Sequence, residues 1–219
     1  MVLPYDNFER AAGPLGTSTT GHAWTLRETG PYDDAGASIA QEESIITLSG
    51  AGTAVFDDTQ RVDHLQFATL DHGTGDSPPD RGWEVEWIGN PTIFSGVGLV
   101  FRWTSPTQYW NAFFYNSALG TLLFLERQNG STFGDASPRV NVDASGLSGA
   151  VNVLRVIAIG SEISVQFNDV ELITMSDSSF ASSSHHGISN FHSGLAPTRF
   201  NYPTEVGGLT VGLLQMRPA

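Results

Sequence analysis

An alternation of apolar and polar residues with a period of two constrains the fold of this chain most strongly. It is clearest over residues 151–173, where Ile163, Val165 and Phe167 fall on one side of a short run. Gly160-Ser161 and Asn168-Asp169 interrupt the alternation with residue types that tolerate the positive φ of tight hairpin turns. We therefore predict a three-stranded antiparallel meander with strands at 153–159, Glu162–Phe167 and 170–173.

Short runs of the same kind recur along most of the chain, and helical periodicity is almost absent. Trp83, Val85 and Trp87 alternate with Glu84 and Glu86, which predicts a strand with its aromatic side facing inward. The other strands that we expect are 23–26, 45–48, Ala54–Phe56, 65–70, 98–103, 109–115, 122–127, 187–191 and 209–214, and the expected loops are 30–41, 71–81, 133–149 and 176–186. About a dozen strands with hairpin-length connections predict an all-β, antiparallel two-sheet β-sandwich, with residues 1–219 as a single domain.

Charge and composition exclude several classes of function. The net charge of −13 disfavours nucleic acid and anionic membranes as partners, because both require a basic surface. The chain contains no cysteine, which excludes disulfides and thiolate metal sites, and no apolar segment is long enough to span a membrane. Residues 1–6 lack the basic and apolar runs of a signal peptide, so we expect synthesis in a cytoplasm without general secretion. All ten basic residues are arginine, which indicates a GC-rich genome such as that of an actinobacterium or its phages.

Three segments carry a resemblance to a known fold family. They are Asp6-Asn7-Phe8-Glu9-Arg10-Ala11-Ala12-Gly13-Pro14-Leu15-Gly16 with Trp24 behind it, Gly96 to Trp103 followed by Tyr109-Trp110, and Leu154-Arg155-Val156 to Asn168-Asp169-Val170. Their order and spacing resemble the concanavalin A-like lectin/glucanase jelly rolls, which include laminin G-like domains. The opening segment is similar to those of phage tail and bacterial extracellular proteins, whereas Val170 stands where glycine is usual in the family.

This resemblance, together with the missing lysine and signal peptide, implies a bacteriophage virion protein, either a minor tail or a capsid-decoration component of an actinobacteriophage. Its expected partners are other virion proteins, host cell-surface polysaccharide and further copies of itself in a homo-oligomer, and its expected location is the virion. The alternatives are a bacterial carbohydrate-binding module or lectin and, as the weaker one, a glycan hydrolase, because shared fold does not settle function.

Glycan hydrolysis on this fold is expected to need acidic residues on one strand in the pattern E-x-D-x-x-E. The nearest match begins at Glu84 and Glu86 and has Gly89 where the family has its acid/base. Since retaining hydrolysis needs two carboxyl groups about 5 Å apart, we predict that the chain is not an enzyme. The two glutamates are instead expected to face solvent and to pair with Arg102 or Arg127.

Candidate ligand-binding residues crowd one predicted hairpin: Arg102, Trp103, Tyr109, Trp110, Asn111 and Tyr115. Aromatic faces stack on sugar rings and planar polar groups bind hydroxyls, but aromatic residues on sandwich strands also form cores, so both interpretations stay open. Tyr109 and Trp110, at the turn, are the residues that we expect to be exposed.

No cofactor is required by any motif, and calcium is the one metal that the resemblance suggests. Asp71 and Asp76 are the candidate ligands, with Asp57-Asp58 as a second oxygen-rich segment. Aspartate before or near glycine is also typical of plain turns, which is the competing interpretation. His185, His186 and His192 match no standard zinc spacing and are expected to be exposed or bonded to the backbone.

Overall fold

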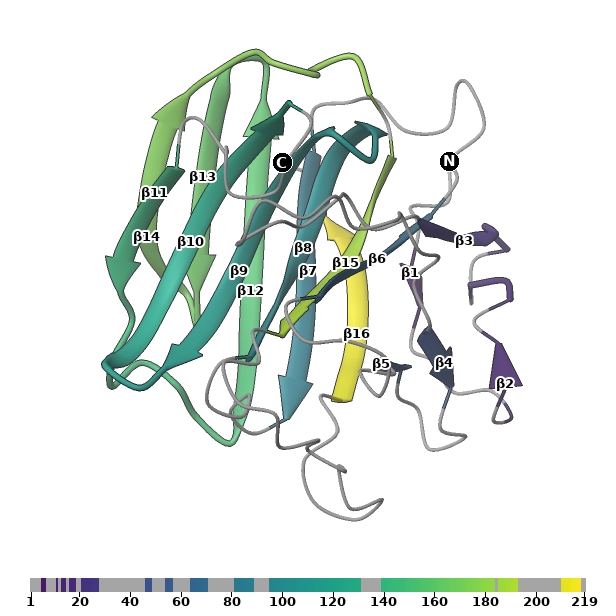
Figure 1. The fold of residues 1–219 in the computed structure, drawn as a ribbon, viewed down its shortest axis with the longest axis horizontal. Helices are drawn as coiled ribbons and strands as arrows, with labels where there is room; N and C mark the ends of the chain where they lie inside the picture. The colour runs from purple at the N-terminus through teal and green to yellow at the C-terminus, as the bar shows by residue number, and fades with distance from the viewer. Residues whose placement is uncertain are drawn as a thin grey trace, which may run out of the picture.

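The computed structural model describes residues 5–6, 11, 13–14, 16–18, 21–27, 46–48, 54–56, 64–70, 81–88, 95–130, 139–183, 185–192 and 210–217. These residues form two antiparallel sheets, which confirms the predicted all-β sandwich. Figure 1 shows β8 to β10 in one layer and β12 to β14 in the other. Among the described residues, no helix is long and apolar enough to cross a membrane.

The seven-stranded sheet has a central group of long strands. In spatial order it comprises β11 (Arg139–Asp143), β10 (Gly120–Asn129), β9 (Gln108–Ser117), β8 (Ser95–Ser105), β15 (His185–His192), β6 (His64–Leu70) and β3 (Trp24–Arg27). The strand β11 corrects the sequence prediction, which placed a loop over 133–149. Its exposed alternate residues Arg139, Asn141 and Asp143 reduce its apolar signal to Val140 and Val142.

The nine-stranded sheet faces it and contains the predicted meander. In spatial order it comprises β14 (Val170–Ser176), β13 (Glu162–Phe167), β12 (Val151–Ile159), β7 (Arg81–Ile88), β16 (Thr210–Arg217), β5 (Ala54–Phe56), β4 (Ile46–Leu48) and β2 (Gly13–Pro14), with β1 (Tyr5–Asp6) also pairing with β16. The turns between β12, β13 and β14 are the predicted ones, because Gly160, Asn168 and Asp169 all have positive φ.

The main core lies between the two sheets and combines aliphatic side chains with stacked aromatic rings. Phe114 of β9 stacks on Phe167 of β13 with ring centroids 4.6 Å apart, and Trp83 of β7 stacks on Phe101 of β8 at 5.5 Å. Trp83, Val85 and Trp87 are fully buried, as their alternation predicts. Since Trp110, Ala112 and Phe114 also belong to this core, the alternate residues of β9 must point to the other side of the seven-stranded sheet.

Candidate functional site

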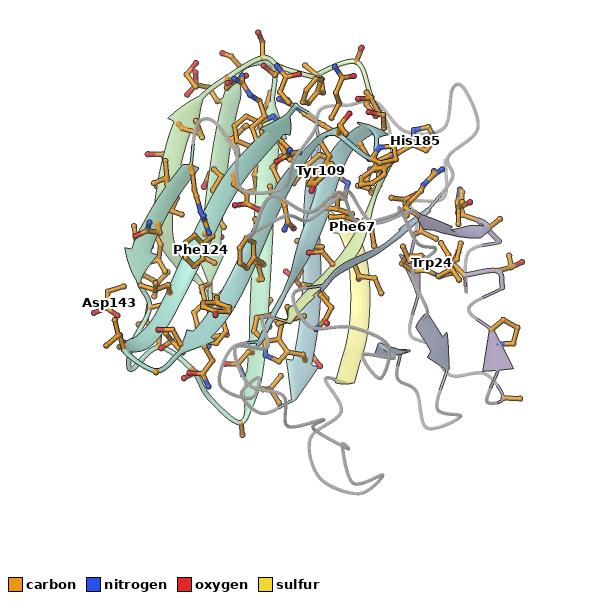
Figure 2. The ribbon with its side chains drawn as sticks, viewed as in Figure 1. Trp24, Phe67, Tyr109, Phe124, Asp143 and His185 are labelled. Atoms are coloured by element: carbon orange, nitrogen blue, oxygen red, sulfur yellow. The ribbon has the colours of Figure 1, made fainter. Side chains whose placement is uncertain are left out.

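The outer face of the seven-stranded sheet, meaning the face that points away from the nine-stranded sheet, carries an unusual set of side chains. Tyr109, Asn111, Phe113 and Tyr115 of β9 point to it because their neighbours occupy the main core. Tyr109 is part of a second apolar cluster with Phe67, Val100 and Trp103, against which Tyr115 packs. Figure 2 labels Phe67, Tyr109 and Phe124, three aromatic residues of this face. The face therefore combines aromatic rings with polar groups.

Aromatic rings hold this cluster together through close and well-oriented contacts. The ring of Tyr109 stacks on that of Trp103 with centroids 4.9 Å apart and meets the edge of Phe67 at the same distance. Such pairs add about 1 kcal/mol each beyond the apolar area that they bury. The hydroxyl of Tyr109 is consequently held in a defined place.

Glu126 of β10 lies at the centre of the polar part of this face. The strand register sets it directly opposite Asn111 on β9 and opposite Arg139 on β11. Only 2% of Glu126 is exposed, and the Arg139 Nε atom lies 3.3 Å from its Oε2 atom. Burial raises the pKa of Glu126 to about 7, and the nearby positive charge of Arg139 offsets only part of that effect. Glu126 is thus a carboxyl group that can hold or release a proton near neutral pH.

Two further polar groups beside Glu126 are buried without a hydrogen-bond partner among the described residues, the Nδ2 atom of Asn111 and the hydroxyl of Tyr109. The Oδ1 atom of Asn111 accepts a hydrogen bond of 2.7 Å from the Ser189 hydroxyl, which fixes the orientation of the amide. Burial, and then the negative charge of Glu126, raises the pKa of Tyr109 well above its usual value, so its hydroxyl keeps its proton. An unsatisfied buried polar group costs about 1–3 kcal/mol. We call Tyr109, Asn111 and Glu126 the polar row.

The outer face opens to solvent toward β11. Phe113 and Phe124 stack with centroids 4.9 Å apart, and Tyr115, which is half-buried, meets Phe124 edge-on at 6.0 Å. The Arg139 guanidinium lies over the Phe124 ring at 4.7 Å, and its side chain is 41% exposed. Asn141 and Asp143 continue the exposed side of β11. A ligand at this end would contact the half-buried Tyr115 ring and the exposed polar groups of β11, because Phe113 and Phe124 are only 2% and 7% exposed.

The structure brings four of the six sequence-predicted binding residues together on the outer face: Trp103, Tyr109, Asn111 and Tyr115. Trp110 lies apart from them, because it is fully buried in the main core between the sheets and its Nε1 atom donates to the Ser179 carbonyl. Arg102 is also directed elsewhere, since its terminal nitrogens donate to the carbonyl oxygens of Asp177 and Gly160. The prediction that Tyr109 and Trp110 are exposed fails for both residues, which are 1% and 0% exposed.

Sequence reasoning missed Glu126 and misjudged Glu84. Glu84 lies on β7 in the other sheet, is almost fully buried, and receives hydrogen bonds of 2.6 and 2.8 Å from Arg155 rather than from Arg102 or Arg127. A signal for Glu126 was available, because it occupies an outward position of the run Leu122 to Arg127. Recognising it required the strand register, since its neighbour Arg139 is on a strand that the sequence pattern did not indicate.

The candidate calcium ligands Asp71 and Asp76, and Asp57-Asp58, lie outside the described residues, so the calcium prediction stays a prediction. Within the described ranges no group of three or more His, Cys, Asp and Glu side chains could hold a metal ion. His186 is buried against Trp83, with ring centroids 4.9 Å apart, which corrects the expectation of an exposed imidazole.

The two antiparallel sheets form a concanavalin-like jelly-roll fold, and solved structures with this fold align with most of the chain. A β-1,3-glucanase from Mycobacterium marinum is 12% identical, with 97% of each chain covered and a TM-score of 0.60. A protein of Mycobacterium tuberculosis described as an immunostimulatory antigen and pseudo β-1,3-glucanase is 11% identical, with 100% of this chain and 99% of that chain covered and a TM-score of 0.59. A carbohydrate-binding module from Bacillus subtilis is 16% identical, covers 88% of this chain and 94% of its own, and has a TM-score of 0.50. No family model and no curated protein sequence matches the chain.

These matches correct the prediction that the chain is not an enzyme. Glucanases share the fold over nearly the whole chain, so the jelly roll itself gives no ground for that conclusion. The strand on which it rested, β7, belongs to the nine-stranded sheet, whereas the ionisable carboxyl of Glu126 is on the other sheet. The matches also give no support to the bacteriophage type of jelly roll that the sequence suggested.

Proposed function

We propose that the chain binds a carbohydrate on the outer face of its seven-stranded sheet. The observation that carries this proposal is the polar row, in which the Tyr109 hydroxyl and Asn111 Nδ2 are buried without a described partner beside Glu126. Sugar hydroxyls both donate and accept hydrogen bonds, so a sugar would satisfy these groups together. Of the surrounding rings, the half-buried ring of Tyr115 suits the apolar face of a pyranose.

The similarity to a carbohydrate-binding module and to glucanases supports this proposal over the virion role, which was the main prediction from the sequence. A carbohydrate would approach this site from the β11 end of the outer face, where Arg139 and Asn141 are exposed. The predicted homo-oligomer and cellular location remain predictions.

Calorimetric titration of the wild type and of Tyr109→Phe with a panel of oligosaccharides, including laminarihexaose, tests the proposal. Y109F removes one hydroxyl and keeps the ring stack, so affinity should fall about tenfold while the melting temperature stays equal or rises. Glu171→Gln, on β14 of the opposite sheet, is the control and should bind as the wild type does. If no sugar of the panel binds, or if Y109F binds as tightly as the wild type, the proposal is wrong.

Hydrolysis of the bound glycan is a second candidate function, favoured by the raised pKa of Glu126, which is typical of a general acid. The mechanism also needs a second carboxylate within about 10 Å. Asp143, the described carboxylate on β11, lies four residues along the strand from the partner of Glu126, about 13 Å away. Residues 139–143 therefore do not supply the second group.

Reducing-end release from laminarin distinguishes binding from hydrolysis. Turnover by the wild type that disappears in Glu126→Gln, with the E171Q control still active, would establish Glu126 as the acid. Wild-type binding without release, at a detection limit that would reveal about one turnover per hour, would reject the second candidate.

A further inference from the structure

Arg139 lies at the β11 end of the outer face, and its positively charged guanidinium has N–H groups that a ligand could bind. Its guanidinium lies over the Phe124 ring, and among the described residues its one ionic partner is Glu126 at 3.3 Å. Within the described part of the chain, its terminal nitrogens donate no hydrogen bond that would occupy them. A planar guanidinium that lies over a ring keeps its remaining N–H groups in the fork that matches a carboxylate.

The charged groups that face Glu126 determine whether the positive charge of Arg139 is neutralised within the protein. From β9 these are Asn111, which is uncharged, and Tyr109, whose raised pKa keeps it neutral, and from β11 the facing group is Arg139. Gln128 and Phe124, which flank Glu126 on β10, carry no charge. Among these neighbours Arg139 is therefore the one charged group, and its charge is neutralised only when Glu126 is ionised.

We propose that Arg139 recognises a carboxylate carried by the bound glycan, as in a uronic acid, and that protonation of Glu126 frees Arg139 for this role. The inference rests on the proposed carbohydrate site and adds the class of sugar and its pH dependence. When Glu126 is ionised, a ligand carboxylate competes with it for one guanidinium and is repelled by it. When Glu126 is protonated, the competition ends and the Arg139 charge is available.

The direction of the pH effect follows from the pKa of Glu126, which is about 7. Below that pH Glu126 is mostly neutral and an acidic sugar binds more tightly, whereas above it the sugar binds more weakly. A ligand carboxylate stays ionised throughout this range, because its own pKa is about 3 to 4. By reciprocity, binding of the acidic sugar raises the pKa of Glu126 further.

Matched pairs of probes test the proposal: laminarihexaose against its C6-oxidised, glucuronate-containing form, and hexagalacturonate against its methyl ester. Each is titrated at pH values of about 5.5 and 8.5 in about 0.15 M salt, which screens the repulsion between the ligand and the net charge of the protein. We expect the acidic member of at least one pair to bind about fivefold more tightly at the lower pH, with no such change for its neutral partner.

Three variants locate the effect. Glu126→Gln should bind the acidic sugar equally at both pH values, and Arg139→Gln should lose the preference for the acidic member. Thr174→Glu, exposed on β14 of the opposite sheet, changes the net charge by the same amount as R139Q and should keep the preference. Melting temperatures confirm that each variant is folded.

The outcomes separate this inference from the proposed function. Neutral sugars that bind in a Tyr109-dependent way, with no gain for the acidic members, would overturn the inference and leave the proposed function intact. A preference that T174E also loses would overturn it as well, because the effect would then be one of net charge. If no member of either pair binds, the inference fails together with the proposed site.

Discussion

Glu126 places a carboxyl group in a buried, aromatic part of the outer face, and the free energy of unfolding should depend on its ionisation. Its pKa is 4.5 as a free side chain and about 7 in the fold. An acid whose pKa is higher in the folded state binds its proton more tightly there, so the fold bears no penalty from this group below the unfolded pKa. As pH rises from about 4.5 to 7 the unfolded chain ionises first, and stability falls.

Glu126→Gln should remove this pH dependence. We expect the free energy of unfolding of E126Q, relative to wild type, to increase by about 3 kcal/mol between pH 4.5 and pH 8, since each pKa unit corresponds to about 1.4 kcal/mol. Urea unfolding of both proteins at several pH values measures this difference, in which contributions from other titrating groups cancel. A difference that stays flat across that range would show that Glu126 ionises normally.

At the residue scale, the sequence identified the residue types of the site but not their directions. Tyr109, Asn111 and Tyr115, which the sequence suggests as sugar ligands because aromatic and amide side chains suit a sugar, lie on the outer face, and their role as ligands stays a prediction. Trp110 was selected for the same reason, and only the β9 alternation shows that it points into the core. Glu126 was missed because its pKa depends on burial and on Arg139, two properties that appear once β10 and β11 pair.

At the scale of elements, β8 and β9 approach each other so closely that one position between them excludes a side chain. A Cβ atom added to Gly98 would lie 2.1 Å from the Ala112 carbonyl oxygen and 2.6 Å from the Phe113 Cβ atom. Relief would require the two strands to separate beneath the outer face, where Phe113 and Asn111 are held.

Gly98→Ala should therefore destabilise the protein by about 3 kcal/mol, at the upper end of the usual cost of overpacking. Gly130→Ala is the matched control, because a Cβ atom there has nothing within 4 Å and the backbone φ is not positive. Urea unfolding should separate the two variants clearly. Equal stability of G98A and G130A would mean that the strands adjust at no cost.

The turn between β13 and β14 offers a cleaner test of backbone strain. Asp169 has a φ of +65°, in the left-handed region that disfavours residues with a Cβ atom. Asp169→Gly and Asp169→Ala both remove the carboxylate and its 3.5 Å contact with Arg155, and they differ in their tolerance of that φ. We expect D169G to be more stable than D169A by about 1 kcal/mol in thermal unfolding. Indistinguishable melting temperatures would argue against strain at this turn.

The sequence predicts a strand well where apolar residues on one face alternate with polar residues on the other. It predicts a strand poorly where the apolar part of this pattern is short. The meander of β12 to β14 alternates apolar and polar residues between turn sequences, and its strands and turns were found. The sequence pattern predicts a loop at the edge strand β11, because only two of its five residues pack on the core. The sequence does not show which strands are neighbours in a sheet. It therefore suggests Arg102 or Arg127 as the ionic partner of Glu84, whereas β7 lies next to β12, which carries Arg155.

At the scale of the whole molecule, the segment after β14 links the nine-stranded sheet to the seven-stranded sheet, whose next strand in the chain is β15. Its Asp177 forms an ion pair of 2.6 Å with Arg127 of β10, and the Asp177 carbonyl accepts a hydrogen bond from Arg102 of β8. Ser179 accepts from both Arg127 and Trp110. These contacts tie the link to three neighbouring strands of the seven-stranded sheet.

Burial acts to raise the pKa of Asp177, but hydrogen bonds from Ser179 and the charges of Arg127 and Arg102 outweigh it and lower the pKa below 3.8. A carboxyl group with a lowered folded pKa stabilises the protein above its unfolded pKa and loses that contribution as pH falls through the folded value. The link between the sheets should therefore weaken in acid.

Asp177→Asn tests this, with Asp143→Asn as its matched control. Both aspartates accept a hydrogen bond from the backbone N–H of a serine two residues later, at 2.7 and 2.8 Å, but only Asp177 is also paired with an arginine. Because a partly buried hydrogen bond to a charged group is worth about 2 kcal/mol, D177N should lose about that much at neutral pH, whereas D143N, at a fully exposed position, should lose far less. The loss in D177N should shrink as pH falls below about 3.8, where Asp177 of the unfolded chain takes up its proton first, and it should vanish below the lowered pKa of the folded protein. Urea unfolding at neutral and acid pH measures both effects, and an equal loss in the two variants would show that the link does not depend on its ion pair.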